Sequence, residues 1–342
     1  MSKKQKLNII TLKPILTQDE INAKEGHYFP ETYYTKYNPI IKLDTDVYGI
    51  ETDGTKKLLL KFRKNVIPEQ ICIDAYNALE KHAKHKNSNR GAAAGKLSVS
   101  KLPKHIGKII KTDSFRVFYK TKTGKISKDN IGNISQSNIA GYYDRPDRNK
   151  YNTKYNTKKT KKSNKKNNTK SNKKNKNTNN SKVPMCRTTQ FTKKNIDKWN
   201  NTIPLIKEAD KLFKQLVPDR YKIQLARAKL TPDFQIANTV YSTITVNYNW
   251  RTAAHCDNGD LDEGFGNLIV LEKAKSNHPE CKGYTGGYLG FPKWGICVDV
   301  RQGDFLAMDV HEFHSNTSIV GDGRLSVVCY LRKKMINCIK KK

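Results

Sequence analysis

The chain has 342 residues, enough for one large domain or two small ones, and 65 Lys and Arg against 31 Asp and Glu give a formal net charge of +34. This excess favours a polyanionic partner such as nucleic acid, although a low-GC codon bias that enriches Lys and Asn would produce it without function. No apolar run approaches the roughly 20 residues that span a bilayer, and the N-terminal apolar stretch is too short for a signal peptide.

Seven cysteines are present, none of them in a Cys-x-x-Cys pair. An odd number of scattered cysteines predicts reduced thiols, and it argues against a disulfide framework or a structural zinc site. We therefore expect a soluble intracellular protein.

The first half of the chain contains few regular patterns. Residues 1–60 are expected to form an N-terminal extension. Apolar residues at Ile71, Ala75 and Leu79 predict a helix over residues 68–82, and Pro68 suits its first turn. A loop of small residues follows at 88–95, and residues 115–119 alternate as in a strand.

A tract of low complexity interrupts the chain at residues 150–182. It contains 13 lysines, no acidic residue and almost nothing apolar. Such a segment cannot bury enough apolar surface to offset the entropy of ordering, so we expect a disordered insertion.

The C-terminal half predicts one helix and then a series of short strands. The helix is expected over residues 204–216, where Leu205, Ala209, Leu212 and Leu216 form an apolar stripe. Strands are expected at residues 240–246, 268–271, 288–291, 296–300, 305–308 and 325–331. This layout is typical of an α+β protein whose strands form an antiparallel barrel or a jelly roll.

A candidate metal site begins with His255-Cys-Asp257, directly after the first of these strands. A second histidine far along the chain would complete a face of two imidazoles and one carboxylate, which is associated with non-haem Fe(II) oxygenases. We favour His314 as this third ligand. His311 is its rival, and Asp260 and Asp262 compete with Asp257.

An arginine ten residues beyond His314 supplies the second part of the pattern. Strand alternation places Arg324 and Ser326 on one face and Leu325, Val327 and Cys329 on the other. A buried guanidinium is costly unless it is paired, and the distal carboxylate of 2-oxoglutarate is a suitable bidentate partner.

The sequence resembles the TET/JBP family of DNA-base dioxygenases, in its J-binding-protein-like branch. The resemblance runs over residues 60–332, outside the lysine-rich tract. Its motifs are NRGAAAG (89–95), GYYDR (141–145), CRTTQFT (186–192), VPDRY (217–221), STITVN (242–247), HCDNGD (255–260), GFG (264–266), GGYL (286–289), DVHEFHSNT (309–317) and RLS (324–326).

The resemblance implies a double-stranded β-helix with flanking helices, formed by residues 61–149 and 183–335. It implies Fe(II) on His255, Asp257 and His314, 2-oxoglutarate held by Arg324, Ser326 and Asn247, and O2 as the oxidant. The substrate would be the methyl group of 5-methylcytosine or thymine, flipped out of double-stranded DNA in a nucleus or other DNA-containing compartment. Arg90 and His311 are candidate contacts to DNA.

Two alternatives remain open at this point. The same iron chemistry could act on a protein side chain or an RNA base. The chain could also be an inactive nucleic-acid-binding module that has kept the fold. We expect no membrane association, and no obligate protein partner is evident.

Overall fold

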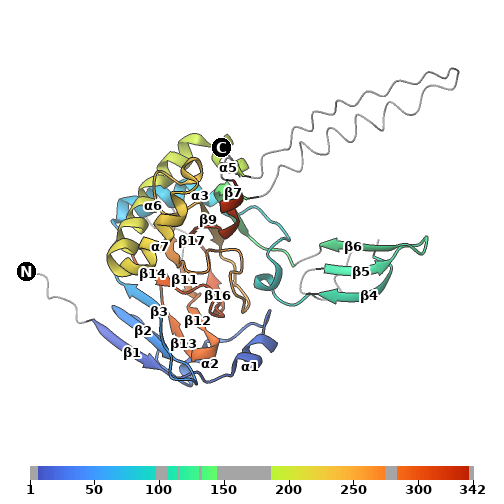
Figure 1. Cartoon of the computed structure of the whole chain (residues 1–342), viewed down its shortest axis with the longest axis horizontal. Coiled ribbons are helices and arrows are strands. Elements are labelled where there is room, and N and C mark those ends of the chain that lie inside the picture. Colours follow the sequence, from blue (N-terminus) through green and yellow to red (C-terminus); the bar gives the residue numbers. More distant parts are fainter. Residues whose placement is uncertain are drawn as a thin grey trace, which may run out of the picture.

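The computed structural model describes residues 7–97, 106–113, 116–130, 133–144, 186–273 and 283–338 (Figure 1). The expected disordered insertion at 150–182 lies outside these residues. The described part contains one nine-stranded sheet, two smaller sheets beside it, and a separate three-stranded sheet.

The nine-stranded sheet is almost entirely antiparallel, with only β1 and β2 running parallel. Its order is β1 (Asn8–Leu12), β2 (Thr45–Ile50), β3 (Lys56–Arg63), β14 (Phe305–Met308), β10 (Gly266–Glu272), β17 (Arg324–Tyr330), β9 (Thr243–Tyr248), β7 (Ser137–Tyr143) and β8 (Arg187–Thr188).

Two small sheets face the central strands of the large one. They are β13 (Ile296–Val298), β12 (Leu289–Phe291) and β15 (Ser315–Asn316), and the pair β11 (Tyr284–Gly286) and β16 (Ile319–Gly321). Leu268, Leu306 and Phe291 belong to one buried apolar cluster shared by both layers. This two-layer arrangement confirms the expected α+β class and double-stranded β-helix.

Helices cover the opposite face of the large sheet, chiefly α3 (Glu69–Ala83), α6 (Ile196–Leu216) and α7 (Pro218–Ala228). The shorter helices are α1 (Gln18–Ala23), α2 (Glu31–Thr35), α5 (Gln190–Lys194) and the 3-10 turns η1 (Gly91–Ala94), η3 (Pro232–Phe234), η5 (Pro292–Trp294) and η6 (Lys333–Cys338). Among the described residues, no helix is both long enough and apolar enough to cross a membrane.

Strand alternation divides the core between these layers. On β10, Ile269 and Leu271 pack against the helices, whereas Leu268 and Val270 face the small sheets. Each fully buried aliphatic side chain stabilises the fold by about 1.5–3 kcal/mol relative to an exposed one. A shift of one residue along a strand would move these side chains to the opposite face, so the packing of both layers depends on the register of the same strands.

The sequence located the main elements but misplaced one helix. The helix expected at residues 68–82 is α3, and most of the expected strands appear within a few residues of their positions. The helix expected to start at Pro204 begins instead at Ile196, with Pro204 inside it. Buried Trp199 and Thr202 extend the buried face of this helix towards its N-terminus, and this packing outweighs the proline as a start signal.

Two long-range contacts were not indicated by the sequence. The described part of the expected N-terminal extension supplies β1, β2 and most of β3, and so pairs with the main sheet. Cys186 and Cys338 form a disulfide with a Cα–Cα distance of 5.8 Å, whereas free thiols were expected. Their separation of 152 residues concealed the pairing, because spacing alone does not reveal which cysteines meet.

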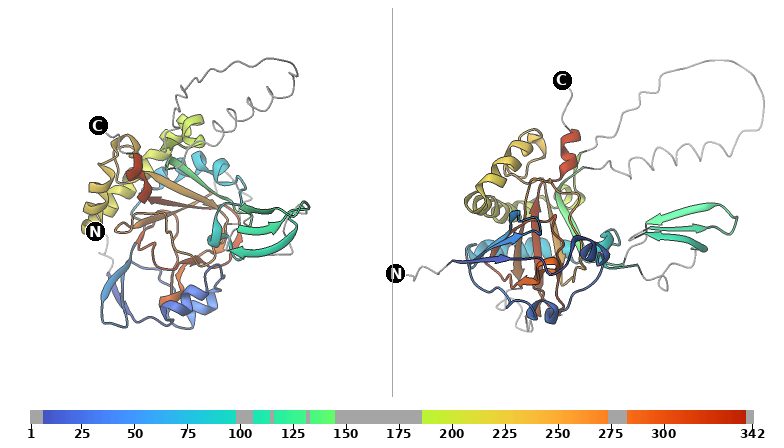
Figure 2. Two further views of the ribbon diagram at one scale, coloured as in Figure 1. Left: turned by 45° about the vertical axis from the view of Figure 1, so that its right-hand side comes forward. Right: turned by 60° about the horizontal axis from the view of Figure 1, so that its bottom comes forward.

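The separate three-stranded sheet projects away from the rest of the molecule. It comprises β4 (Lys108–Asp113), β5 (Arg116–Lys120) and β6 (Ile126–Asn130). Both views in Figure 2 agree with Figure 1 that these strands extend outward, with the β5–β6 turn at the far end. We call this unit the arm.

Removing a side chain between α3 and the large sheet tests the helical layer. Leu79 is fully buried, so Leu79→Ala is expected to lower the free energy of unfolding by about 2–5 kcal/mol. The exposed Lys81 on the same helix provides the control, and Lys81→Ala should change it by no more than about 0.5 kcal/mol. Urea denaturation measures both, and equal effects would contradict the packing described.

Candidate metal centre and its cavity

The main chain brings the two histidines of the candidate site together. His255 N donates to His314 O (3.1 Å), and His314 N donates to His255 O (3.0 Å), which forms an isolated antiparallel bridge. Asp257 N then donates to Val310 O at 3.0 Å. The segment carrying His255 is held from the other side, where Ala253 N donates to Ala93 O at 2.9 Å.

Both imidazoles are fixed with their Nε2 atoms available. His255 Nδ1 lies 2.8 Å from Ala253 O, and His314 Nδ1 lies 2.9 Å from Glu312 O. Because a carbonyl oxygen can only accept, each Nδ1 carries the proton and leaves an Nε2 lone pair for a metal. Burial, followed by the neighbouring His314, lowers the pKa of His255 to about 4, which keeps the ring neutral.

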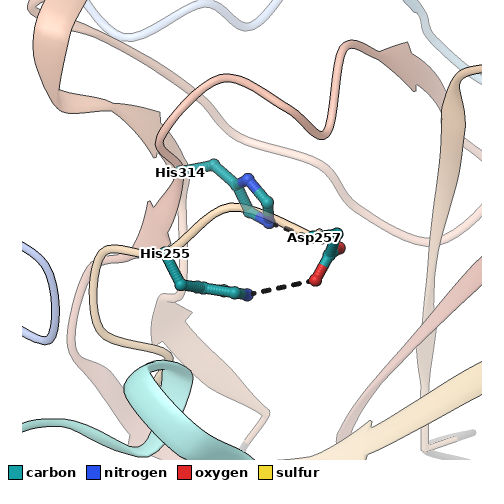
Figure 3. A group of neighbouring side chains, drawn as sticks. All are labelled: His255, Asp257 and His314. Atoms are coloured by element: carbon teal, nitrogen blue, oxygen red, sulfur yellow. Dashed lines mark ion pairs between the residues drawn. The ribbon is translucent and has the colours of Figure 1, made fainter. Parts of the chain in front are cut away.

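The three side chains converge on one point (Figure 3). Asp257 places Oδ1 3.7 Å from His255 Nε2 and Oδ2 3.7 Å from His314 Nε2. One potential ligand atom from each residue lies within 4.8 Å of the others. The donor set of two imidazoles and a carboxylate is the one that Fe(II) sites use when further coordination positions stay open.

The rival ligands lie elsewhere. His311 directs Nδ1 to Asp309 (3.2 Å) and Nε2 towards Asp262 (3.7 Å), and it is not part of the converging group. Asp262 is an exposed partner of Lys333. Asp260 is buried and its Oδ2 has no hydrogen-bond partner among the described residues, but it too stays outside the group.

A cavity of about 330 Å³ opens beside the three side chains. Its wall from β17 consists of alternate residues, Ser326, Val328 and Tyr330. Val327 and Cys329, which lie between them, belong to the helical core. The expected alternation along this strand is therefore observed. Other lining residues include Asn89, Arg90, Ser137, Asn247, Thr252, Asp260, Leu289, Asn316 and Arg332.

Hydrogen bonds join neighbouring strands across the cavity floor. Asn247 on β9 donates from Nδ2 to Ser326 Oγ (3.1 Å), and its Oδ1 accepts a hydrogen bond from Ser137 Oγ. These contacts hold Asn247 and Ser326 side by side with their polar ends at the cavity.

Arg324 lies at the end of the same strand face, fully buried with 1% of its surface exposed. Its Nη2 donates to Gly287 O (3.1 Å), yet its Nε has no partner and it forms no ion pair within the described part of the chain. A Cβ at Gly287 would approach Arg324 Nε to 2.9 Å, so only glycine leaves room here. A buried guanidinium with an unsatisfied donor suits an anionic ligand.

Further polar and charged residues line the cavity. Arg90, an expected DNA contact, lines it and donates from Nε to Ser137 O at 3.0 Å, whereas His311, the other expected contact, does not line it. Burial and the nearby Asp257 raise the pKa of Asp260 well above its usual value. Arg332 was missed as a site residue, although continuing the β17 alternation by two residues would have found it.

Part of the sequence matches a known protein family. Residues 171–333 match the Tet_JBP model, described as the oxygenase domain of the 2OGFeDO superfamily. Over these residues, slightly less than half of the chain, the sequence is similar to the TET/JBP oxygenase domain. All three converging side chains lie within the matched residues, and the family together with this ligand set implies Fe(II) and 2-oxoglutarate as cofactor and co-substrate.

Curated relatives are similar to this chain over less than half of its length. Thymine dioxygenase JBP1 of Trypanosoma brucei brucei is 36% identical over 154 residues, 43% of this chain and 17% of the relative. The bifunctional helicase and thymine dioxygenase JBP2 of Leishmania major is 35% identical over 158 residues, 45% of this chain and 13% of the relative. The matches thus span less than a fifth of either relative.

Among solved structures, that of NgTET1 in complex with 5mC DNA aligns over 95% of this chain and 94% of its own, with a TM-score of 0.45 and 11% identity. The two facing sheets of this chain and the family match both support a double-stranded β-helix.

Exchanging each histidine tests which one belongs to the metal centre. Replacing a residue that only hydrogen-bonds to a metal ligand weakens metal binding by up to roughly 100-fold. His314→Ala removes a ligand itself and should therefore weaken Fe(II) binding by more than this. His311→Ala should change it much less, since His311 faces Asp309 and Asp262. Anaerobic Fe(II) titration measures both affinities, and the reverse ranking would exclude His314 as a ligand.

Proposed function

We propose that this protein is an Fe(II)- and 2-oxoglutarate-dependent dioxygenase that oxidises the methyl group of a pyrimidine base, 5-methylcytosine or thymine, in DNA. The observation that carries the proposal is the convergence of His255, Asp257 and His314 at the wall of a polar cavity, with Arg324 buried nearby.

The metal would be held by His255 Nε2, His314 Nε2 and the Asp257 carboxylate. The hydrogen bonds from each Nδ1 to a main-chain carbonyl would fix both rings, so that they need not reorient when the metal binds. When bound, iron and 2-oxoglutarate supply the oxidising chemistry, and the remaining tasks belong to the chain.

The co-substrate would be anchored through its distal carboxylate. Arg324 offers an unsatisfied Nε that is buried in the protein, and a carboxylate would relieve the cost of burying that charge. Ser326 and Asn247 lie on the same side of the neighbouring strands and would add hydrogen bonds. Together these residues would orient the co-substrate and exclude water from its distal end.

The substrate would be a single base rotated out of the duplex. A cavity of about 330 Å³ is at the lower end of the size range of small-molecule sites, about 300–1,000 Å³, and cannot admit a duplex. Arg90, Asp260 and Arg332 supply donors and acceptors on the wall that such a base would face. Flipping a base costs a few kcal/mol, which contacts to the flanking phosphates would offset.

Two observations support DNA as the polymer. The net charge of +34 favours a polyanion, and the similar proteins named above are called thymine dioxygenases. The same reasoning would place the protein in a DNA-containing compartment.

Nucleoside mass spectrometry tests this proposal directly. Protein, Fe(II), 2-oxoglutarate and O2 are incubated with duplexes containing 5-methylcytosine, duplexes containing thymine alone, RNA, or a basic peptide. We expect a hydroxymethylated pyrimidine from DNA, and none from the Asp257→Ala variant. Turnover of RNA or peptide alone would refute the DNA proposal. Iron binding without any turnover would favour a non-enzymatic nucleic-acid-binding module.

Substitution of Arg324 tests its proposed role. Losing a charge-assisted hydrogen bond costs about 1.5–3 kcal/mol, so Arg324→Gln should raise KM for 2-oxoglutarate about 10- to 100-fold. Ser326→Ala, which removes a neutral group, should raise it only about 2- to 10-fold. Fe(II) affinity should stay unchanged in both variants. Succinate release measures KM, and an unaltered KM in Arg324→Gln would contradict the proposed anchor.

A further inference from the structure

No described residue of the arm lines the cavity. Its sequence, residues 106–130, contains seven basic and two acidic residues. It projects from the body of the molecule (Figure 1), and none of its described residues belongs to either main core cluster. An element of this kind needs an explanation outside the stability of the oxygenase fold.

The lysines of the arm with described side chains gather at its far end. Lys108 begins β4, Lys120 ends β5, and Lys122 and Lys125 belong to the turn between β5 and β6; all four are exposed. In both figures this turn is the part of the arm farthest from the body. The positive charge of the arm therefore lies at its outer end, where it could contact a ligand that extends beyond the cavity.

The arrangement of these lysines is unfavourable for the arm itself. Lys108 and Lys120 are directly opposite on neighbouring strands, and like charges in such a pair destabilise a sheet. Lysines on edge strands commonly prevent aggregation, and this would explain Lys108 on β4. It does not explain Lys120, because β5 is the central strand of the arm. Local conflicts of this kind are expected at functional surfaces.

The base of the arm is fastened to the cavity wall. On the side leading out of the arm, Asn133 Nδ2 donates to Ala94 O (2.9 Å) and Lys96 O (3.0 Å). Two residues further, Ser135 and Asn87 exchange main-chain hydrogen bonds of 2.8 and 2.9 Å. The segments joined in this way continue into Ala93 and Ser137, which line the cavity.

We propose that the arm is a DNA-binding element, in which Lys108, Lys120, Lys122 and Lys125 contact phosphates of the duplex on one side of the target base. This inference rests on the proposed function. A strand of six residues spans about 20 Å, which corresponds to about 6 base pairs. Because a single arm leaves the cavity wall in one direction, the contacts would be one-sided.

A matched pair of variants tests the proposal. The arm variant changes all four lysines to Gln, and the control variant makes the same change at the exposed Lys207, Lys214, Lys222 and Lys229 of the helical layer. Both lose four positive charges, so a difference between them reports position rather than total charge. Fe(II) affinity should stay unchanged in both, and the unfolding temperature should fall in neither, since the arm variant also removes the opposed Lys108–Lys120 pair.

Binding to a long duplex with one central target base is measured by fluorescence anisotropy between about 50 and about 200 mM salt. Each phosphate contact contributes about 0.9 to the slope of log K against log salt, so the arm variant should lose about two to four units of slope and bind about 10- to 100-fold more weakly at low salt. The control variant should retain most of the slope. Equal losses in both variants would overturn the proposal.

Duplex truncation provides a second test on the unmutated protein. Shortening the duplex to about 4 base pairs on one side of the target should remove the arm's contacts, whereas the same truncation on the other side should not. The arm variant should be insensitive to which side is cut. Equal sensitivity of the unmutated protein to both cuts would overturn the arm proposal alone, whereas no binding to any duplex would refute the DNA substrate as well.

Discussion

The site depends on two main-chain hydrogen bonds between His255 and His314. They join segments that are 59 residues apart in the chain, at 3.1 and 3.0 Å, and so set the separation of the two imidazoles. Since backbone groups make this connection, the side chains remain available for a ligand. Hydrogen bonds from each ring to a carbonyl oxygen then fix the rings. The position of Asp257 is fixed because its main-chain amide donates to Val310 O.

A single strand, β17, connects the stability of the fold to the cavity. Its odd-numbered residues Leu325 and Val327 pack under the helices, whereas the even-numbered Ser326 and Val328 line the cavity. A shift of one residue in register would exchange the two sets and expose the apolar ones to the cavity. The packing of α3 and α6 therefore also specifies the direction of the polar groups.

How far the sequence predicts this molecule depends on the range of the interactions. The convergence of His255, Asp257 and His314 could be predicted because ligand chemistry restricts residue type. The burial of Arg324 could be predicted because strand alternation restricts side-chain direction. The β17 alternation was readable for the same reason. Contacts between distant segments were not readable: the Cys186–Cys338 pair, the entry of β2 into the main sheet, and the start of α6 before Pro204 are all decided by tertiary packing.

The strand order has a practical consequence for defining the smallest folding unit. The family match begins at residue 171, yet β14 pairs with β3 and β9 pairs with β7, both of which precede it. A fragment restricted to the matched residues would leave the outer edges of β14 and β9 without a partner strand, and it would lack α3, which packs against the sheet. The evolutionary signature is therefore narrower than the autonomous domain, and expression boundaries should follow the sheet.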